Sequence, residues 1–158
     1  MSLFKAGILY DVGNFDEGEI QGINALKLFS KIKNKRLVYE SNVIIALCLK
    51  ELNNYEKALE YFRVALNLLD QLENEKFPIE KILKSRIACY NNMGRVYEKM
   101  GKYNEAVSLY KTGLKTKDLK QNYPKLYAML LNNLAYSKMK LGKTQGVEDL
   151  LLESLRIR

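Results

Sequence analysis

Several residue types are missing or scarce in this sequence, and each absence excludes a class of protein. The 158 residues contain no histidine, which removes the side chain most often used as a general base and metal ligand near neutral pH. Catalytic arrangements that depend on histidine, such as the serine–histidine–aspartate triad, are therefore excluded. The only two cysteines form no Cys-x-x-Cys pair, so a disulfide framework is not indicated.

Long apolar runs are also missing. The longest run, Val43 to Leu49, has seven residues, whereas a membrane-spanning helix needs about 20. The N-terminus lacks the pattern of a signal peptide. Cys48 and Cys89 fall inside apolar helical patterns, where we expect buried thiols that act as small hydrophobic side chains. Because Asn-x-Ser/Thr glycosylation sites are absent as well, we expect a cytoplasmic protein that does not bind membranes.

Positive charge is in excess, with a formal net charge of +8. One stretch contains a single acidic residue, Asp118, among five lysines at positions 111, 115, 117, 120 and 125. The region Lys111–Lys125 could attract an acidic partner, an anionic membrane or nucleic acid, or it could be a solvated surface. Its lysines are spread over several helical faces without interleaved aromatic residues, which favours the solvated surface and disfavours nucleic acid.

One motif recurs four times along the chain. It has a small residue, a Gly or Asn seven positions later, an aromatic residue two positions after that, and a second small residue three positions further. The copies begin at Ala6, Ala46, Gly94 and Ala135. The last copy is eroded, with Thr144 and Val147 at its final positions. Recurrence at long, fairly regular intervals is typical of a repeat protein.

Each motif position has a physical role at a junction between two helices. Gly13, Gly101 and Gly142 are expected just past a helix end, where the backbone is often left-handed and glycine adopts it without penalty. Asn53 is the usual substitute. The aromatic residue is expected to fill the turn, and the two small residues let antiparallel helices approach closely.

The flanking segments have helical hydrophobic periodicity, and no strand alternation is present. Helices are predicted over residues 2–12, 15–32, 36–52, 55–76, 79–100, 103–117, 124–141 and 144–158, which makes eight helices in four hairpins. The sequence therefore predicts an all-α fold. We expect one domain over residues 1–158, with repeats at about 2–32, 36–76, 79–117 and 124–158.

The third copy of the motif, continued by Tyr110, closely resembles the tetratricopeptide repeat. The resemblance is weaker in the first copy, where Gly22 stands in place of an aromatic residue. It implies a right-handed α–α superhelix, a TPR-like solenoid of about four helix hairpins. The motif steps are 40, 48 and 41 residues, against about 34 in the family. Units of this length resemble kinesin light chains and bacterial peptide-sensing regulators, and we expect the extra residues to lengthen the helices.

The resemblance also implies where a partner would bind. In the family, the first helix of each hairpin lines a concave groove, and the residues not used in packing face it. In this sequence the positions are Asn91, Asn92, Arg95, Lys99, Asn132, Asn133, Tyr136 and Lys140. The pairs Asn91–Asn92 and Asn132–Asn133 stand 41 residues apart, although asparagine is a mediocre helix former.

We interpret these asparagines as peptide-binding residues. A side-chain amide has both a donor and an acceptor, so Asn92 and Asn133 would hold a peptide backbone. Arg95 and Lys140 would attract its carboxylates. The alternative is that the amides satisfy neighbouring helix ends or simply face water.

The sequence therefore predicts a protein- or peptide-binding module, the sensor or scaffold part of a bacterial regulatory protein. We expect neither an enzyme nor a cofactor or metal site. The alternative is a structural or oligomerisation segment. It is supported by leucines 150, 151, 152 and 155 of the last predicted helix, which has no visible capping helix although solenoid ends normally carry a polar cap. Such an end suits a homodimer through this helix, or a fragment of a longer protein.

Overall fold

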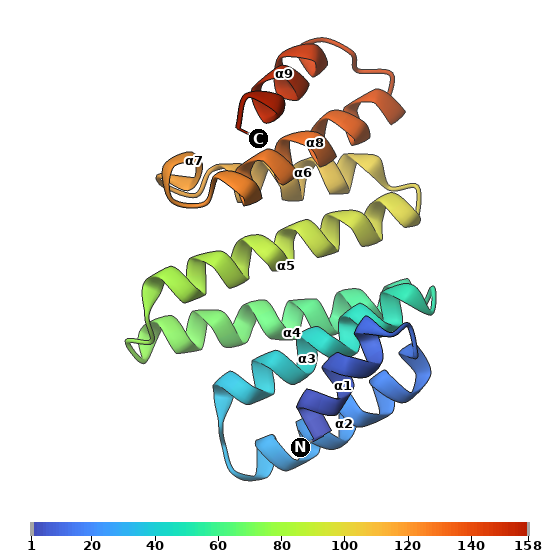
Figure 1. Cartoon of the computed structure of the whole chain (residues 1–158), viewed down its shortest axis with the longest axis vertical. Helices are drawn as coiled ribbons and strands as arrows, with labels where there is room; N and C mark the ends of the chain where they lie inside the picture. The colour runs from blue at the N-terminus through green and yellow to red at the C-terminus, as the bar shows by residue number, and fades with distance from the viewer. Residues whose placement is uncertain (1, 158) are drawn as a thin grey trace. The chain divides into compact units, whose positions relative to one another are not determined.

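The computed structural model describes residues 2–157, and every regular element in that range is a helix (Figure 1). The all-α fold predicted from the sequence is confirmed. In chain order the helices are α1 (Ser2–Asp11), α2 (Phe15–Lys31), α3 (Lys35–Glu51), α4 (Tyr55–Asn74), α5 (Ile79–Lys99), α6 (Tyr103–Leu114), α7 (Leu119–Asn122), α8 (Pro124–Lys140) and α9 (Val147–Ile157). Within this range no helix is long and apolar enough to cross a membrane.

The chain divides into two compact units, Met1–Ile82 and Leu83–Arg158, and the division falls inside α5. Repeat proteins contact mainly their sequence neighbours and share no central core, so such a division does not decide between one solenoid and two domains. The single domain over residues 1–158 stays a prediction, and its two end residues lie outside the described range.

The four motif positions that were predicted to end a helix all have a left-handed backbone. Their φ values are +81° at Gly13, +61° at Asn53, +72° at Gly101 and +69° at Gly142. In each turn, the N–H of the following residue donates to the carbonyl five residues earlier. This hydrogen bond belongs to the Schellman cap, which satisfies carbonyls left open at a helix end. The predicted role of these residues is confirmed.

The first unit contains α1 to α4, and two of its glycines make room for α3. A Cβ atom on Gly22 would lie 2.7 Å from Cγ1 of Ile45, so the α3 side chain occupies the place expected for an aromatic residue. The sulfur of Cys48 lies beside Gly18 in the same way. Both cysteines are buried and outside any disulfide, as predicted. Burial raises the pKa of the Cys48 thiol to about 11, so it stays protonated at neutral pH.

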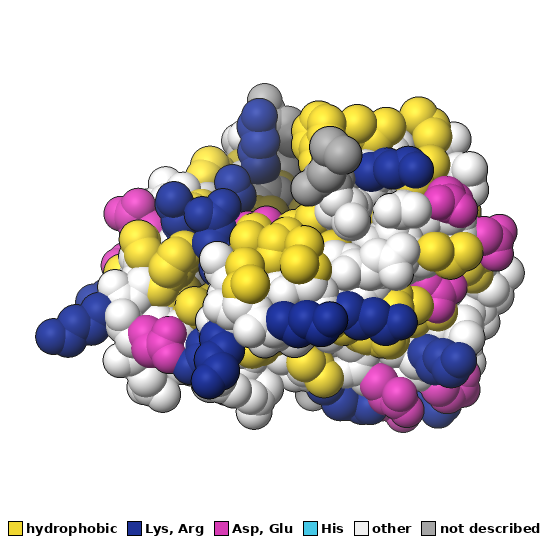
Figure 2. Space-filling model, turned by 90° about the horizontal axis from the view of Figure 1, so that it is seen from below, with side chains coloured by type: hydrophobic (Ala, Val, Ile, Leu, Met, Phe, Trp, Pro, Cys, Tyr) yellow, Lys and Arg dark blue, Asp and Glu magenta, His cyan; other side chains and the backbone are white. Residues whose placement is uncertain are grey.

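The first unit also exposes apolar side chains. Phe4 and Ile8 are four residues apart on α1 and therefore lie on one helix face, and Val12 follows directly after the helix end. Their exposed fractions are 76%, 47% and 71%. Figure 2 shows hydrophobic side chains at the surface, interspersed with basic and acidic ones. The apolar stripe of α1 is thus left uncovered within the described chain.

The second unit has a core cluster formed by Ile87, Ala106, Tyr110, Leu119, Leu130 and Leu134. Its tightest contact joins α5 to α6, where a Cβ on Gly94 would lie 2.4 Å from Cε1 of Tyr110. The Tyr110 side chain is fully buried, and its hydroxyl has no hydrogen-bond partner among the described residues. Burial raises the pKa of Tyr110, and the nearby Glu98 carboxylate raises it further. Gly94, the first small residue of the motif, and Tyr110, the aromatic residue that continues the motif, therefore form one interlocking pair.

Two boundaries in the second unit differ from the sequence prediction. The helix expected over 103–117 ends at Leu114, because Asp118 takes a left-handed φ of +54° and the buried Leu119 anchors the short helix α7. The extra residues of the repeats were expected to lengthen the helices, and they do so in α4 and α5, which have 20 and 21 residues. The expectation is wrong for residues 115–123, which form a connection that contains α7. The last helix begins at Val147 rather than at 144, after a left-handed Gly146.

We predict that Gly94→Ala destabilises the protein by about 1–3 kcal/mol, the usual cost of overpacking a core. The matched control is Gly7→Ala in α1, where an added Cβ meets nothing within 4 Å and alanine gains up to about 1 kcal/mol of helix propensity. Urea unfolding of the three proteins measures the difference. Equal midpoints for Gly94→Ala and the unmodified protein would contradict the interlocking contact.

Candidate functional site

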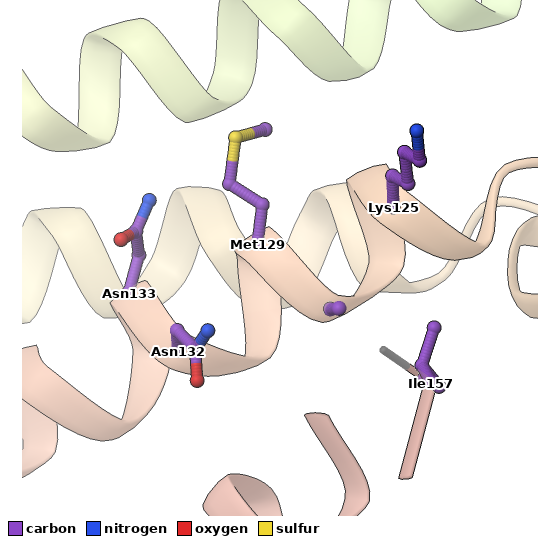
Figure 3. A pocket seen from close by; sticks show the side chains of 6 residues that line it. Lys125, Met129, Asn132, Asn133 and Ile157 are labelled. Atoms are coloured by element: carbon purple, nitrogen blue, oxygen red, sulfur yellow. The ribbon is translucent and has the colours of Figure 1, made fainter. Parts of the chain in front are cut away.

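A cavity of about 570 Å³ lies against α8 (Figure 3). This helix begins at Pro124, because proline suits the first turn of a helix, where it has no N–H to leave unsatisfied. The cavity is lined by Lys125, Ala128, Met129, Asn132, Asn133 and Ile157. Lys125, Met129 and Asn133 follow one edge of α8 at four-residue spacing, whereas Asn132 projects from the opposite side of the helix, the side on which Ile157 lies.

A side-chain amide bridge joins α8 to α5. Asn133 Nδ2 donates a 2.7 Å hydrogen bond to Asn91 Oδ1, and Asn91 is only 5% exposed. One turn further along α8, Ser137 Oγ donates to Glu98 Oε1 at 2.7 Å. Buried polar groups in folded proteins are nearly always hydrogen-bonded. In these two bridges, polar side chains of α5 and α8 satisfy one another without any ligand.

The structure brings two of the eight predicted site residues, Asn132 and Asn133, into the cavity. Asn91 differs from the expectation of an open groove position, because its side chain is buried and bonded to Asn133. The Asn132 amide has no hydrogen-bond partner among residues 2–157. Of the two amides, Asn132 is therefore the one free to bind a ligand.

The other predicted residues lie outside the set that lines the cavity. Asn92 is partly buried on α5, and Arg95, Lys99 and Lys140 are exposed. Tyr136 is 46% exposed, and its ring lies under the ammonium group of Lys140 at 5.4 Å from the centroid. A role for these five residues in binding stays a prediction.

Sequence reasoning missed part of the lining. Met129 occupies the second position of the fourth repeat, one of the positions expected to face the groove, so its signal was present. Lys125 stands one turn before it on the same face. Ile157 comes from α9, and no local pattern connects it to α8.

Polar contacts place α9, and with it Ile157, beside the cavity. Glu153 accepts hydrogen bonds from Lys120 Nζ and from Tyr127 Oη, each at 2.9 Å. Ser154 Oγ donates to the Ala128 carbonyl at 3.1 Å. The hydrogen bond from Lys120, and to a smaller extent the one from Tyr127, holds the pKa of Glu153 below its ordinary value. Because Ile157 follows Glu153 by one helical turn, this network fixes one wall of the cavity.

The tetratricopeptide repeat family model matches residues 39–68 and 86–117. The first match covers most of α3 and the greater part of α4, and the second covers most of α5 and all of α6. These two segments are tetratricopeptide repeats. These repeats are generally non-catalytic modules for protein interaction, so the chain is a protein-binding repeat module.

Two solved structures share this tetratricopeptide-repeat fold. BtubC (BKLC) from P. vanneervenii aligns over 99% of this chain and 61% of its own, with a TM-score of 0.85 and 20% identity. A Rap protein complexed with Competence and Sporulation Factor aligns over 98% of this chain and 42% of its own, with a TM-score of 0.78 and 24% identity. At these identities the likeness establishes the fold.

A sequence relative is the human Protein O-mannosyl-transferase TMTC2, which is 34% identical over 71 residues. The match covers 44% of this chain and 8% of the relative. The shared part is thus a short stretch of a much longer protein.

We predict that acid weakens the attachment of α9 through Glu153. A carboxyl whose pKa is lowered in the folded state stabilises that state above its unfolded pKa, and this contribution is lost as pH falls through the folded pKa. The pKa of Glu153 is lowered from its ordinary value of 4.5, so its contribution to stability is lost at pH values below 4.5. Urea unfolding of the unmodified protein and Glu153→Gln at neutral and acidic pH measures it.

The stability difference between the two proteins should shrink on acidification. Tyr127→Phe keeps the ring and removes one of the two hydrogen-bond donors to Glu153. Its loss of stability on acidification should therefore lie between that of the unmodified protein and that of Glu153→Gln. A Glu153→Gln difference that is the same at both pH values would contradict this role for the carboxylate.

Proposed function

We propose that the module binds an extended peptide segment of a partner protein in the α8 cavity. The observation that carries the proposal is the amide of Asn132, which has no partner among residues 2–157, in a cavity of about 570 Å³ that the apolar side chains of Met129 and Ile157 also line. We also propose that the chain is the sensor or scaffold part of a bacterial regulatory protein and acts in the cytoplasm.

An extended peptide fits this arrangement chemically. Its backbone offers a donor and an acceptor at every residue, and one asparagine amide can pair with both kinds of group. Such pairing holds the backbone whatever the peptide's side chains are. One N–H of Asn133 already donates to Asn91, which fixes the orientation of that amide, so Asn132 takes the backbone role, with Asn92 as a second candidate on α5. Ala128, Met129 and Ile157 supply apolar contact for a peptide side chain.

Two further observations support the proposal. The Rap protein with a similar fold was solved in complex with Competence and Sporulation Factor, which supports ligand binding and a regulatory role for this type of repeat. The buried thiols Cys48 and Cys89 are compatible with a compartment in which disulfides are rare, which supports the cytoplasm.

We predict that Asn132→Ala weakens peptide binding about threefold to tenfold, the value of one or two net hydrogen bonds. The purified chain is first screened against an array of random peptides, and the strongest binder is titrated by fluorescence anisotropy. Asn24→Ala, at an exposed helical site on α2, makes the same chemical change as a control. Asn133→Ala is less informative because it also breaks the bridge to Asn91.

Unchanged affinity for Asn132→Ala, or an equal loss for Asn24→Ala, would show that the cavity is not the binding site. Absence of any saturable peptide in the screen would remove the proposed function itself.

The second candidate function is self-association through α9. It is favoured by Leu151, Leu152 and Leu155, whose exposed fractions are 37%, 44% and 62%, because uncovered apolar side chains gathered on one helix mark interaction surfaces. This candidate predicts a molar mass that rises towards the dimer with concentration, measured by light scattering. Leu152→Glu with Leu155→Glu should abolish the rise, whereas Val64→Glu on α4 should not. A constant monomer mass would dismiss it.

A further inference from the structure

The two units carry very different charge. Residues 83–158 hold fifteen of the 26 lysines and arginines but only six of the 18 aspartates and glutamates, a net charge of +9. Residues 1–82 hold eleven lysines and arginines and twelve aspartates and glutamates, which gives a net charge of −1. The positive charge of the protein therefore belongs to the unit that contains the α8 cavity. A field of one sign raises the local concentration of oppositely charged ligands and speeds their association.

Cations extend from the cavity along one side. Lys125 lines the cavity and also a second pocket of about 250 Å³, which Lys84 of α5 lines as well. Among residues 2–157, no carboxylate lines either space. Neither ammonium group is in an ion pair with another described residue. Two unpaired cations thus stand beside an apolar cavity.

The side towards α9 is different. A third pocket shares Ile157 with the cavity. It is lined by two carboxylates, those of Asp149 and Glu153, and by two cations, Lys120 and Arg156, so charges of both signs lie there, whereas the charged residues that line the pocket beside Lys84 are cations. Lys120 and Tyr127 already bind Glu153, so part of this acidity is compensated. An anionic ligand held in the cavity would therefore extend past Lys125 towards Lys84, and away from Asp149.

We propose that the ligand of the α8 cavity is an acidic peptide segment, with one apolar side chain against Met129 and Ile157 and carboxylates facing Lys125 and Lys84. This inference rests on the proposed function and names its ligand class. The six residues lining the cavity include no aromatic side chain, and Tyr123 is the single aromatic residue among those that line the pocket beside Lys84, although single-stranded nucleic acid is usually held by stacking of successive bases on several aromatic side chains. An amide beside apolar side chains instead matches a peptide backbone and its side chain.

The test uses three pools of fluorescein-labelled random peptides of equal length, one rich in Asp and Glu, one neutral and one rich in Lys and Arg. A labelled single-stranded oligonucleotide is the fourth probe. Binding to the full chain is followed by anisotropy at low and high salt. The key variant is Lys84→Gln with Lys125→Gln. The matched control is Lys111→Gln with Lys117→Gln, which removes the same charge from exposed positions on α6 and the loop after it.

The acidic pool should bind most tightly and weaken at high salt, because salt screens exposed charges. The Lys84/Lys125 variant should lose about tenfold in affinity for it, and the Lys111/Lys117 control much less. Equal binding of neutral and acidic pools, still dependent on Asn132, would overturn the acidic preference and leave the proposed function standing. Binding of no pool would overturn both. Tighter, Lys84/Lys125-dependent binding of the oligonucleotide would assign the surface to nucleic acid instead.

Discussion

The close approach of paired helices at small residues is the constraint on which the rest of the structure depends. Where α5 carries Gly94, the ring of Tyr110 from α6 occupies the space of a side chain. Between α2 and α3 the same relation holds with Gly22 and Ile45. Such contacts fix the distance and rotation of each helix pair, because an interlocked side chain permits little sliding.

The turns complete this constraint. A left-handed residue at each of the four helix ends reverses the chain within a few residues, and its cap satisfies the exposed carbonyls. Helices joined in this way can bury one face and leave another for binding. In the last hairpin, Lys125, Met129 and Asn132 of α8 line a cavity that no described side chain fills. A repeat fold thus produces a binding surface from the positions that packing does not use.

The polar residues of this surface have two separate tasks. Asn133 bonds to Asn91, and Ser137 bonds to Glu98, so these four side chains join neighbouring helices. Asn132 and Lys125 have no such partners and remain available to a ligand. In the proposed function, the charge of +9 on residues 83–158 would select among ligands at long range, while the apolar side chains of the lining would act only on contact.

Local sequence determined the helices and their turns, because capping by Gly13, Asn53, Gly101 and Gly142 and helical periodicity are properties of a few adjacent residues. It also indicated Asn132 and Asn133 by their place in the repeat. Only the tertiary structure decided which amide is free, since the partner of Asn133 is 42 residues away in the chain. Ile157 likewise reaches the cavity through contacts of α9 with distant helices. Side-chain partners across helices depend on packing, which no local pattern specifies.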